Sequence, residues 1–168
     1  MTAQVEEYLR SRQQKIAFPL RLYGLVDGLL YRDHAGGSPL SRSSSRIALF
    51  YGTPDEALAH AGPWLLDCSA DHDSYLPALH RMGNSATGCI WIVSAYAPED
   101  LAAALRARLN VRMPSGAIAL LRYYDARITS DIIALLTPVQ LAAFFAPVLD
   151  WLIQRDGILT RIYQSHGT

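Results

Sequence analysis

The segment 122–127 concentrates charged and aromatic side chains. Arg122, Tyr123, Tyr124, Asp125 and Arg127 follow an apolar stretch that starts at a turn near residue 116. A strand that ends in this way places charge and ring area at the edge of a sheet, where α/β proteins usually keep their functional residues. These residue types suit catalysis, binding or stabilisation of the fold, and their spacing alone does not choose among the three.

Asp27 and Asp125 each end a predicted apolar strand. If those strands are adjacent, the two carboxylates could converge like the paired acids of hydrolases, with Arg122 as a clamp for an anionic substrate. The alternative is that each aspartate caps a turn or pairs with Arg122, Arg127 or Arg21. An Asp that faces an Arg at a strand end is more often an ion pair than an acid–base dyad, so the sequence favours the second interpretation.

Other catalytic and metal-binding patterns are weak. The sequence has no Gly-x-Ser-x-Gly elbow and no glycine-rich phosphate loop after a strand. The group Asp71-His72-Asp73 resembles metal ligands, but it lies at a predicted helix start, where carboxylates act as caps. Cys68 and Cys89 lie in apolar runs and are expected to be buried free thiols. We therefore expect no metal, no cofactor and no catalytic residue.

Strands and helices alternate along most of the chain. The patterns predict strands over residues 19–30, 47–51, 63–67 and 88–95, a hairpin over 111–113 and 116–124, and helices over 2–15 and 71–83 and after Thr53 and Pro98. Residues 32–46 are rich in Gly and Ser and predict a loop. This order is typical of a mixed α+β or α/β fold, with a central, mostly parallel or mixed sheet flanked by helices.

The character of the chain changes after residue 127. Three short apolar stretches, over 128–136, 137–145 and 148–153, predict helices, and residues 158–163 predict a final edge strand. We therefore divide the chain into an α/β core domain over 1–127 and a helical C-terminal segment over 128–168, packed on that core.

Composition limits the possible partners. The 168 residues are 51% hydrophobic and only 18% charged, with a formal net charge of zero. A surface of low charge suggests that a partner covers part of it. No basic stripe favours nucleic acid, and no apolar stretch is long enough to span a membrane. The N-terminus lacks the apolar region of a secretory signal, so a cytoplasmic location is expected.

Several segments together resemble the bacterial type VI secretion effector chaperones, or adaptors, a family long catalogued only as a domain of unknown function. In chain order, they are Leu22-Tyr-Gly-Leu-Val-Asp-Gly28, Leu49-Phe-Tyr-Gly-Thr-Pro54, Ala61-Gly-Pro-Trp-Leu65, the strand over 90–95, Val111-Arg-Met-Pro-Ser-Gly116, Leu121-Arg-Tyr-Tyr-Asp-Ala-Arg127 and Leu136-Thr-Pro-Val-Gln-Leu-Ala-Ala-Phe-Phe-Ala-Pro147. The ordered set, above all the Arg-Tyr-Tyr-Asp end, carries the resemblance. The chain departs from the family at Ala126, where Pro is frequent, in the loop over 36–45, and in its short C-terminal region.

The resemblance implies a non-catalytic cytoplasmic protein. It would hold the N-terminal region of a secreted toxic effector and help to load it onto the spike tip protein. Residue types nominate four aromatic side chains for partner contacts: Tyr51, Trp64, Tyr96 and Tyr123. The segments that carry the resemblance nominate six residues as a structural signature: Asp27, Gly52, Gly62, Pro63, Arg122 and Asp125. In this interpretation Arg122 and Asp125 lock the strand end onto the following helices, and one tyrosine remains for a client.

Overall fold

A six-stranded sheet forms the centre of the protein in a computed structural model that describes residues 3–69 and 74–165. The strands are β1 (Arg21–Asp27), β2 (Arg46–Ala48), β3 (Pro63–Asp67), β4 (Cys89–Ser94), β7 (Asp150–Arg155) and β8 (Ile158–Gln164). Their order is β2-β3-β1-β4-β7-β8, and every neighbouring pair is antiparallel. The prediction of a mixed α+β fold is confirmed, whereas that of a mostly parallel or mixed sheet is wrong.

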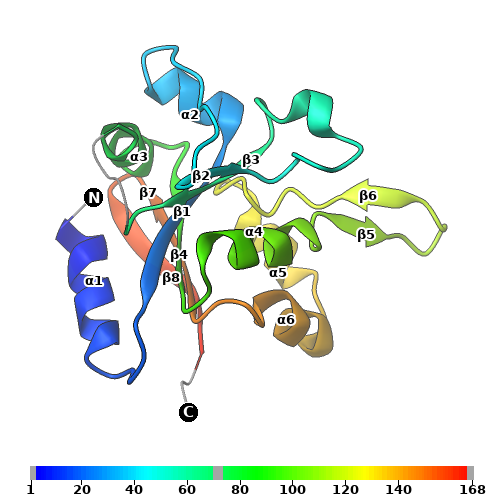
Figure 1. The fold of residues 1–168 in the computed structure, drawn as a ribbon. Coiled ribbons are helices and arrows are strands. Elements are labelled where there is room, and N and C mark those ends of the chain that lie inside the picture. Colours follow the sequence, from blue (N-terminus) through cyan, green and yellow to red (C-terminus); the bar gives the residue numbers. More distant parts are fainter. Residues whose placement is uncertain (1–2, 70–73, 166–168) are drawn as a thin grey trace.

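Helices cover both faces of this sheet, as Figure 1 shows for α1 and α3 on one side and α4, α5 and α6 on the other. The helices are α1 (Ala3–Gln13), α2 (Gly28–His34), α3 (Leu76–Gly83), α4 (Pro98–Arg106), α5 (Thr129–Ala134) and α6 (Pro138–Phe145), with a short 3-10 turn η1 at Glu56–Leu58. This coverage explains the near-continuous apolar strands, because each strand sends alternate side chains into one of two cores. In β1, Tyr23 and Leu25 enter one core, and Leu22 and Val26 enter the other.

The residues after 127 do not form a separate helical segment. The helices predicted over 128–136 and 137–145 correspond to α5 and α6, but the predicted helix over 148–153 is wrong, because β7 occupies that position and pairs with β4. A short apolar run fits a buried strand as well as a buried helix, and here the pairing partner decides. With β8 on its other side, β7 makes the C-terminal part of the chain integral to the central sheet.

Two further elements differ from the sequence predictions. Helix α2 extends to His34, so the predicted loop begins later than residue 32. The stretch after Thr53 is only the 3-10 turn η1, where the Thr53 hydroxyl accepts a hydrogen bond from the Asp55 N–H at 3.2 Å.

A two-stranded hairpin, β5 (Asn110–Arg112) and β6 (Ile118–Leu120), projects away from the central sheet (Figure 1). Its existence confirms the sequence prediction, but β6 ends at Leu120, and residues 122–125 lie in a turn rather than in a strand. Within residues 3–69 and 74–165, no helix combines the length and apolarity that crossing a membrane requires.

Candidate functional site

Asp27 lies at the end of β1, where its carboxylate is already used by the fold. The residue is 5% exposed and is the N-cap of α2. Its Oδ1 accepts hydrogen bonds from the backbone N–H groups of Leu29 at 2.9 Å and Leu30 at 3.2 Å. The other oxygen, Oδ2, lies 3.3 Å from Nη2 of Arg122. Asp27 therefore caps a helix and pairs with an arginine at the same time.

Asp125 is even more completely bonded, and it is 2% exposed. Its Oδ1 accepts hydrogen bonds from the N–H of Arg127 at 3.0 Å and from Nε of the same residue at 2.9 Å. Its Oδ2 lies 2.8 Å from Nη2 of Arg127 and 3.3 Å from Nη2 of Arg122. Burial alone raises the pKa of Asp125, but the hydrogen bonds and charges of Arg127 and Arg122 outweigh it and hold that pKa below its ordinary value.

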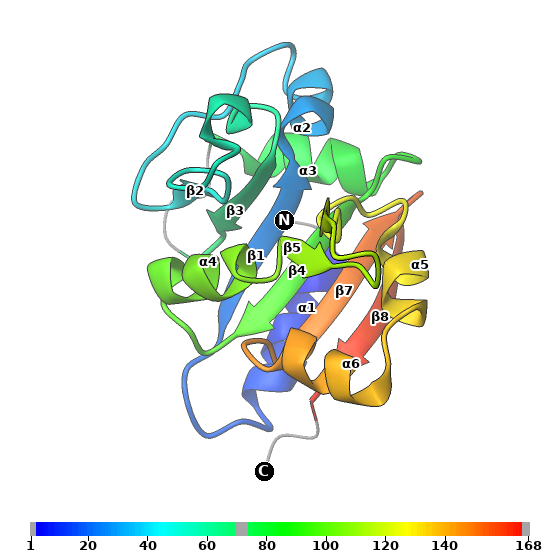
Figure 2. The same cartoon turned by 90° about the vertical axis from the view of Figure 1, so that its right-hand side faces the viewer.

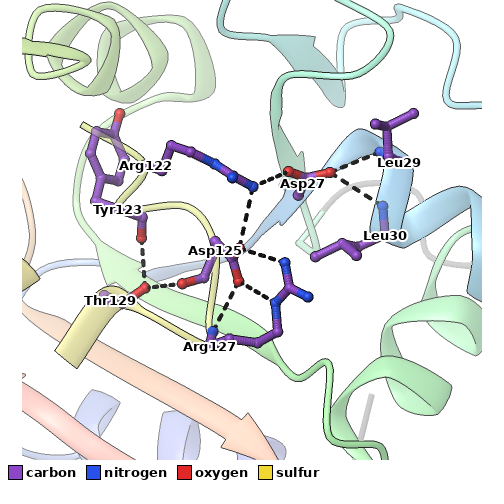
Figure 3. Close-up of polar contacts among 8 residues, drawn as sticks. All are labelled: Asp27, Leu29, Leu30, Arg122, Tyr123, Asp125, Arg127 and Thr129. Carbon is purple, nitrogen blue, oxygen red and sulfur yellow. Dashed lines mark hydrogen bonds and ion pairs between the residues drawn. The ribbon is translucent and has the colours of Figure 1, made fainter. Parts of the chain in front are cut away.

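Arg122 bridges the two aspartates, and Figure 3 shows its guanidinium between them. An acid–base dyad needs one carboxyl group whose pKa is raised so that it holds a proton. The pKa of Asp125 is shifted the other way, and a cation occupies the position between the two carboxylates. The geometry favours the ion-pair interpretation over the hydrolase. Arg21, the other arginine considered, pairs with Asp67 at 3.4 Å.

A model of the family described as "Domain of unknown function (DUF4123)" matches residues 22–143. The chain belongs to this family. The matched span runs from β1 to α6 and includes the whole cluster of Asp27, Arg122, Asp125 and Arg127, but excludes α1, β7 and β8. No curated protein and no solved structure matches the chain.

The two tyrosines of this family member do not face opposite sides, as a strand would require. Both are buried in the same core, Tyr123 at 0% and Tyr124 at 4% exposure, because the chain turns here. The hydroxyl of Tyr123 donates to the carbonyl of Leu105 at 2.7 Å, and its own carbonyl accepts from the Thr129 hydroxyl at 2.8 Å (Figure 3). The proposal of Tyr123 as an exposed contact residue is therefore wrong.

The other aromatic candidates divide by exposure. Trp64 is 3% exposed within the core, so its nomination for partner contact is also wrong. Its position in β3, a strand covered on both faces, explains the burial. Tyr51 and Tyr96 are 42% and 45% exposed, and their role in binding stays a prediction. The ring of Tyr51 lies beneath the guanidinium of Arg42, whose carbon is 3.3 Å from the ring centroid.

The remaining signature residues serve the backbone. Gly52 has a positive φ of 75°, a backbone conformation that residues other than glycine rarely adopt. Gly62 packs so closely on Phe50 that an added Cβ would lie 2.3 Å from the ring, and its carbonyl accepts the Gly28 N–H at 2.8 Å. Pro63 begins β3 as predicted. Together with the Asp27 cap, these contacts fix the start of α2 against the start of β3.

Metal and thiol chemistry find no support among the described residues. Within 3–69 and 74–165, no three or more His, Cys, Asp or Glu side chains group as metal ligands would. The candidate Asp71-His72-Asp73 lies outside the described residues. Cys68 and Cys89 are free and buried, as predicted, and burial raises the pKa of the Cys68 thiol to about 12. Burial raises the pKa of Cys89 as well.

Sequence reasoning missed a buried ion pair between Arg12 and Asp150, whose Nε and Oδ2 atoms are 2.7 Å apart. These residues are 7% and 0% exposed. Burial raises the pKa of Asp150, and the hydrogen bond and charge of Arg12 only partly oppose that shift. The pair anchors α1 to the start of β7. Because 138 positions separate the partners, no local pattern could have revealed the contact.

Proposed function

We propose that this chain is a chaperone or adaptor that binds the N-terminal region of a type VI secretion effector in the cytoplasm and helps to load it onto the spike tip protein. Two findings support the proposal. The chain belongs to the DUF4123 family, and the ordered motifs that resemble effector chaperones lie mostly within the matched span.

The observation that carries the proposal is an apolar surface around the hairpin and α6. A groove of about 340 Å³ lies where the base of the hairpin meets α6, lined by Ala107, Arg108, Asn110, Val111, Leu121, Leu136, Gln140, Ala143 and Phe144. Five large apolar residues of the same region are exposed, namely Met113, Ile118, Leu120, Leu135 and Val139. Leu135 and Val139 are the most exposed of the five, at 84% and 80%, and an exposed apolar patch beside a groove is typical of an interaction site.

The shape of this surface suits an extended or helical segment of another protein better than a small substrate. The hairpin projects from the sheet (Figure 1), and it carries three of the exposed apolar side chains, Met113, Ile118 and Leu120. The central part of a protein interface is typically apolar and depleted of charge. A client segment that is apolar and aggregation-prone on its own would gain solubility by covering this surface.

The experiment is co-expression of the chain with the product of each adjacent gene, followed by co-purification. We expect one product to be soluble and secreted only when this chain is present. The double variant Leu135→Asp/Val139→Asp should abolish capture, since two buried carboxylates without partners oppose binding. Ile158→Asp is the matched control, because Ile158 is also 67% exposed but lies on β8.

Two results would contradict the proposal. One is a neighbouring product that is equally soluble and equally secreted without this chain. The other is a client that binds the Leu135/Val139 double variant as tightly as it binds the Ile158 control, because the apolar surface that carries the proposal would then not be the binding site.

A further inference from the structure

A second hollow, of about 580 Å³, lies between the edge of the sheet at β2 and helix α4. It is lined by Arg42, Ser43, Arg46, Ile47, Ala48, Tyr51, Gly52, Glu99 and Arg106. Figure 2 shows β2 and α4 on the same side of the molecule, at the opposite edge of the sheet from β8. None of these residues takes part in the ion-pair cluster or lines the groove at the hairpin.

Three guanidinium groups line this hollow, and each is held by one contact with a neighbouring residue. Arg42 stacks on the ring of Tyr51. Arg46 donates from Nε to the Ser43 hydroxyl at 3.2 Å, and Arg106 donates from Nε to the carbonyl of Leu49 at 3.0 Å. These contacts orient the side chains but leave the terminal Nη groups available. A guanidinium oriented in this way loses little further entropy when it binds a carboxylate in a bidentate manner.

The hollow carries an excess of positive charge. Across residues 3–69 and 74–165, none of its three arginines forms an ion pair, whereas Arg12, Arg21, Arg122 and Arg127 all do. Among the described residues, Glu99 is the only acid in the lining, and the carboxylate of Glu56 lies at its border, where it accepts the N–H of Gly52 at 2.9 Å. The three arginines thus outnumber the acids in a chain whose net charge is zero. An anionic partner is therefore complementary to this site.

The backbone of β2 does not offer an alternative way to bind a peptide. The N–H and the carbonyl of Arg46 are both bonded to Ser43, and the carbonyl of Ala48 accepts the N–H of Tyr51 at 3.2 Å. Addition of a strand needs such groups to be free along the edge. Recognition here must therefore come from side chains.

We propose that this hollow binds the carboxylate side chains of an acidic segment in a partner protein. Arg42, Arg46 and Arg106 supply the donors, and the exposed ring of Tyr51 supplies apolar contact area, a combination typical of residues that dominate protein interfaces. The inference goes beyond the proposed function, since it holds for any protein partner.

The test is a fluorescence anisotropy titration of the full chain with a short labelled peptide in which Glu alternates with Ser. A peptide with Gln in place of Glu is the neutral reference. We expect the acidic peptide to bind and the neutral one not to bind. Arg42→Glu/Arg46→Glu should weaken binding about tenfold or more. Arg155→Glu, a single charge reversal of the same kind on an exposed side chain at the end of β7, should have little effect.

Glu99→Gln provides a gain of binding that misfolding cannot imitate. Removal of the opposing carboxylate should strengthen binding of the acidic peptide about twofold or more. Thermal melts of all variants check that they are folded. Because the assay needs no effector, failure to find a client in the co-expression experiment does not affect it.

Four results would overturn the inference. The first three are equal binding of the acidic and neutral peptides, equal effects of the Arg42/Arg46 and Arg155 variants, and weaker binding after Glu99→Gln. The fourth comes from competition. A short single-stranded oligonucleotide and inorganic phosphate are the competing ligands. If either displaces the peptide and binds more tightly than it does, the hollow recognises phosphate groups and the assignment to a carboxylate is wrong.

Discussion

Replacement of Asp125 by alanine separates a structural role of the Arg122 cluster from a role in partner binding. Asp125 accepts one backbone and several side-chain hydrogen bonds while it is 2% exposed, so its removal leaves the N–H of Arg127 without this acceptor. Breaking a buried ion pair from one side costs about 3–5 kcal/mol. Here both arginine side chains remain almost half exposed, at 46% and 47%, and water can solvate them after the loss.

We therefore expect Asp125→Ala to lower the free energy of unfolding by about 2–3 kcal/mol, less than for a fully buried pair. For a chain of this size, that corresponds to a decrease in Tm of roughly 5–10 °C. Urea denaturation at neutral pH measures the effect. Asp131→Ala is the control, since Asp131 is an exposed acid on α5, and it should change stability by less than about 0.5 kcal/mol.

The contribution of the Asp125 cluster to stability should decrease when the pH is lowered. The folded state holds the pKa of Asp125 below its ordinary value, so the cluster stabilises the fold above the unfolded pKa of about 4 and loses that contribution as pH falls below it. The difference between wild type and Asp125→Ala should therefore be constant near neutrality and narrow only in acid. A variant that melts like the wild type yet no longer captures its client would refute this reasoning, because the cluster would then be an interface.

Three further predictions concern the core. Arg12→Ala should lower the free energy of unfolding by about 3–5 kcal/mol at neutral pH, because it leaves the buried carboxylate of Asp150 without its arginine. Since the pKa of Asp150 is raised, this loss should be smaller at acidic pH, where that carboxyl takes up a proton. Equal losses in urea denaturation at neutral and acidic pH would contradict this reasoning. Gly62→Ala should destabilise by about 1–3 kcal/mol in thermal melts, since the new Cβ would meet the ring of Phe50 at 2.3 Å. Both cysteine thiols should react with a thiol reagent only after denaturant is added, because both are buried and burial raises their pKa.

Local signals in the sequence were sufficient for most individual elements. The strand at Pro63–Asp67 has the predicted bounds, since Pro63 and the turn before it mark its start. Helix α4 begins at Pro98, with Glu99 and Asp100 in its first turn, as its dipole favours. The hairpin turns at Gly116, which has a positive φ of 86°. In each case the residues that decide the structure are neighbours in sequence.

Features that depend on distant partners were not predictable. The direction of the strands depends on which of them pair, and β1 lies between β3 and β4, a choice that no residue of β1 encodes alone. Residues 148–153 are apolar enough for a helix or a strand, and β4 decides in favour of the strand. The burial of Tyr123 follows from the end of β6 at Leu120, which lets the chain turn and places both tyrosines in one core.

Substitutions in one of the two proposed binding surfaces should not affect binding at the other, because a different arginine contacts each surface. Arg106 is the last residue of α4, and Arg108 follows shortly after it. Arg106 donates to the carbonyl of Leu49 beside the basic hollow. Arg108 instead donates to the carbonyls of Ala143 and Phe144 at the end of α6, at 2.6 and 2.8 Å, and so holds α6 against the hairpin groove.

We therefore expect Arg42→Glu/Arg46→Glu to weaken binding of the acidic peptide about tenfold or more, while the chain still captures a client through its apolar groove. Leu135→Asp/Val139→Asp should have the reverse effect, since the substitutions lie outside the hollow. Substitutions at sites that share no partners usually act independently. If each double variant impairs both assays while its thermal melt stays unchanged, the groove and the hollow belong to one continuous interface, and the separation argued from Arg106 and Arg108 is wrong.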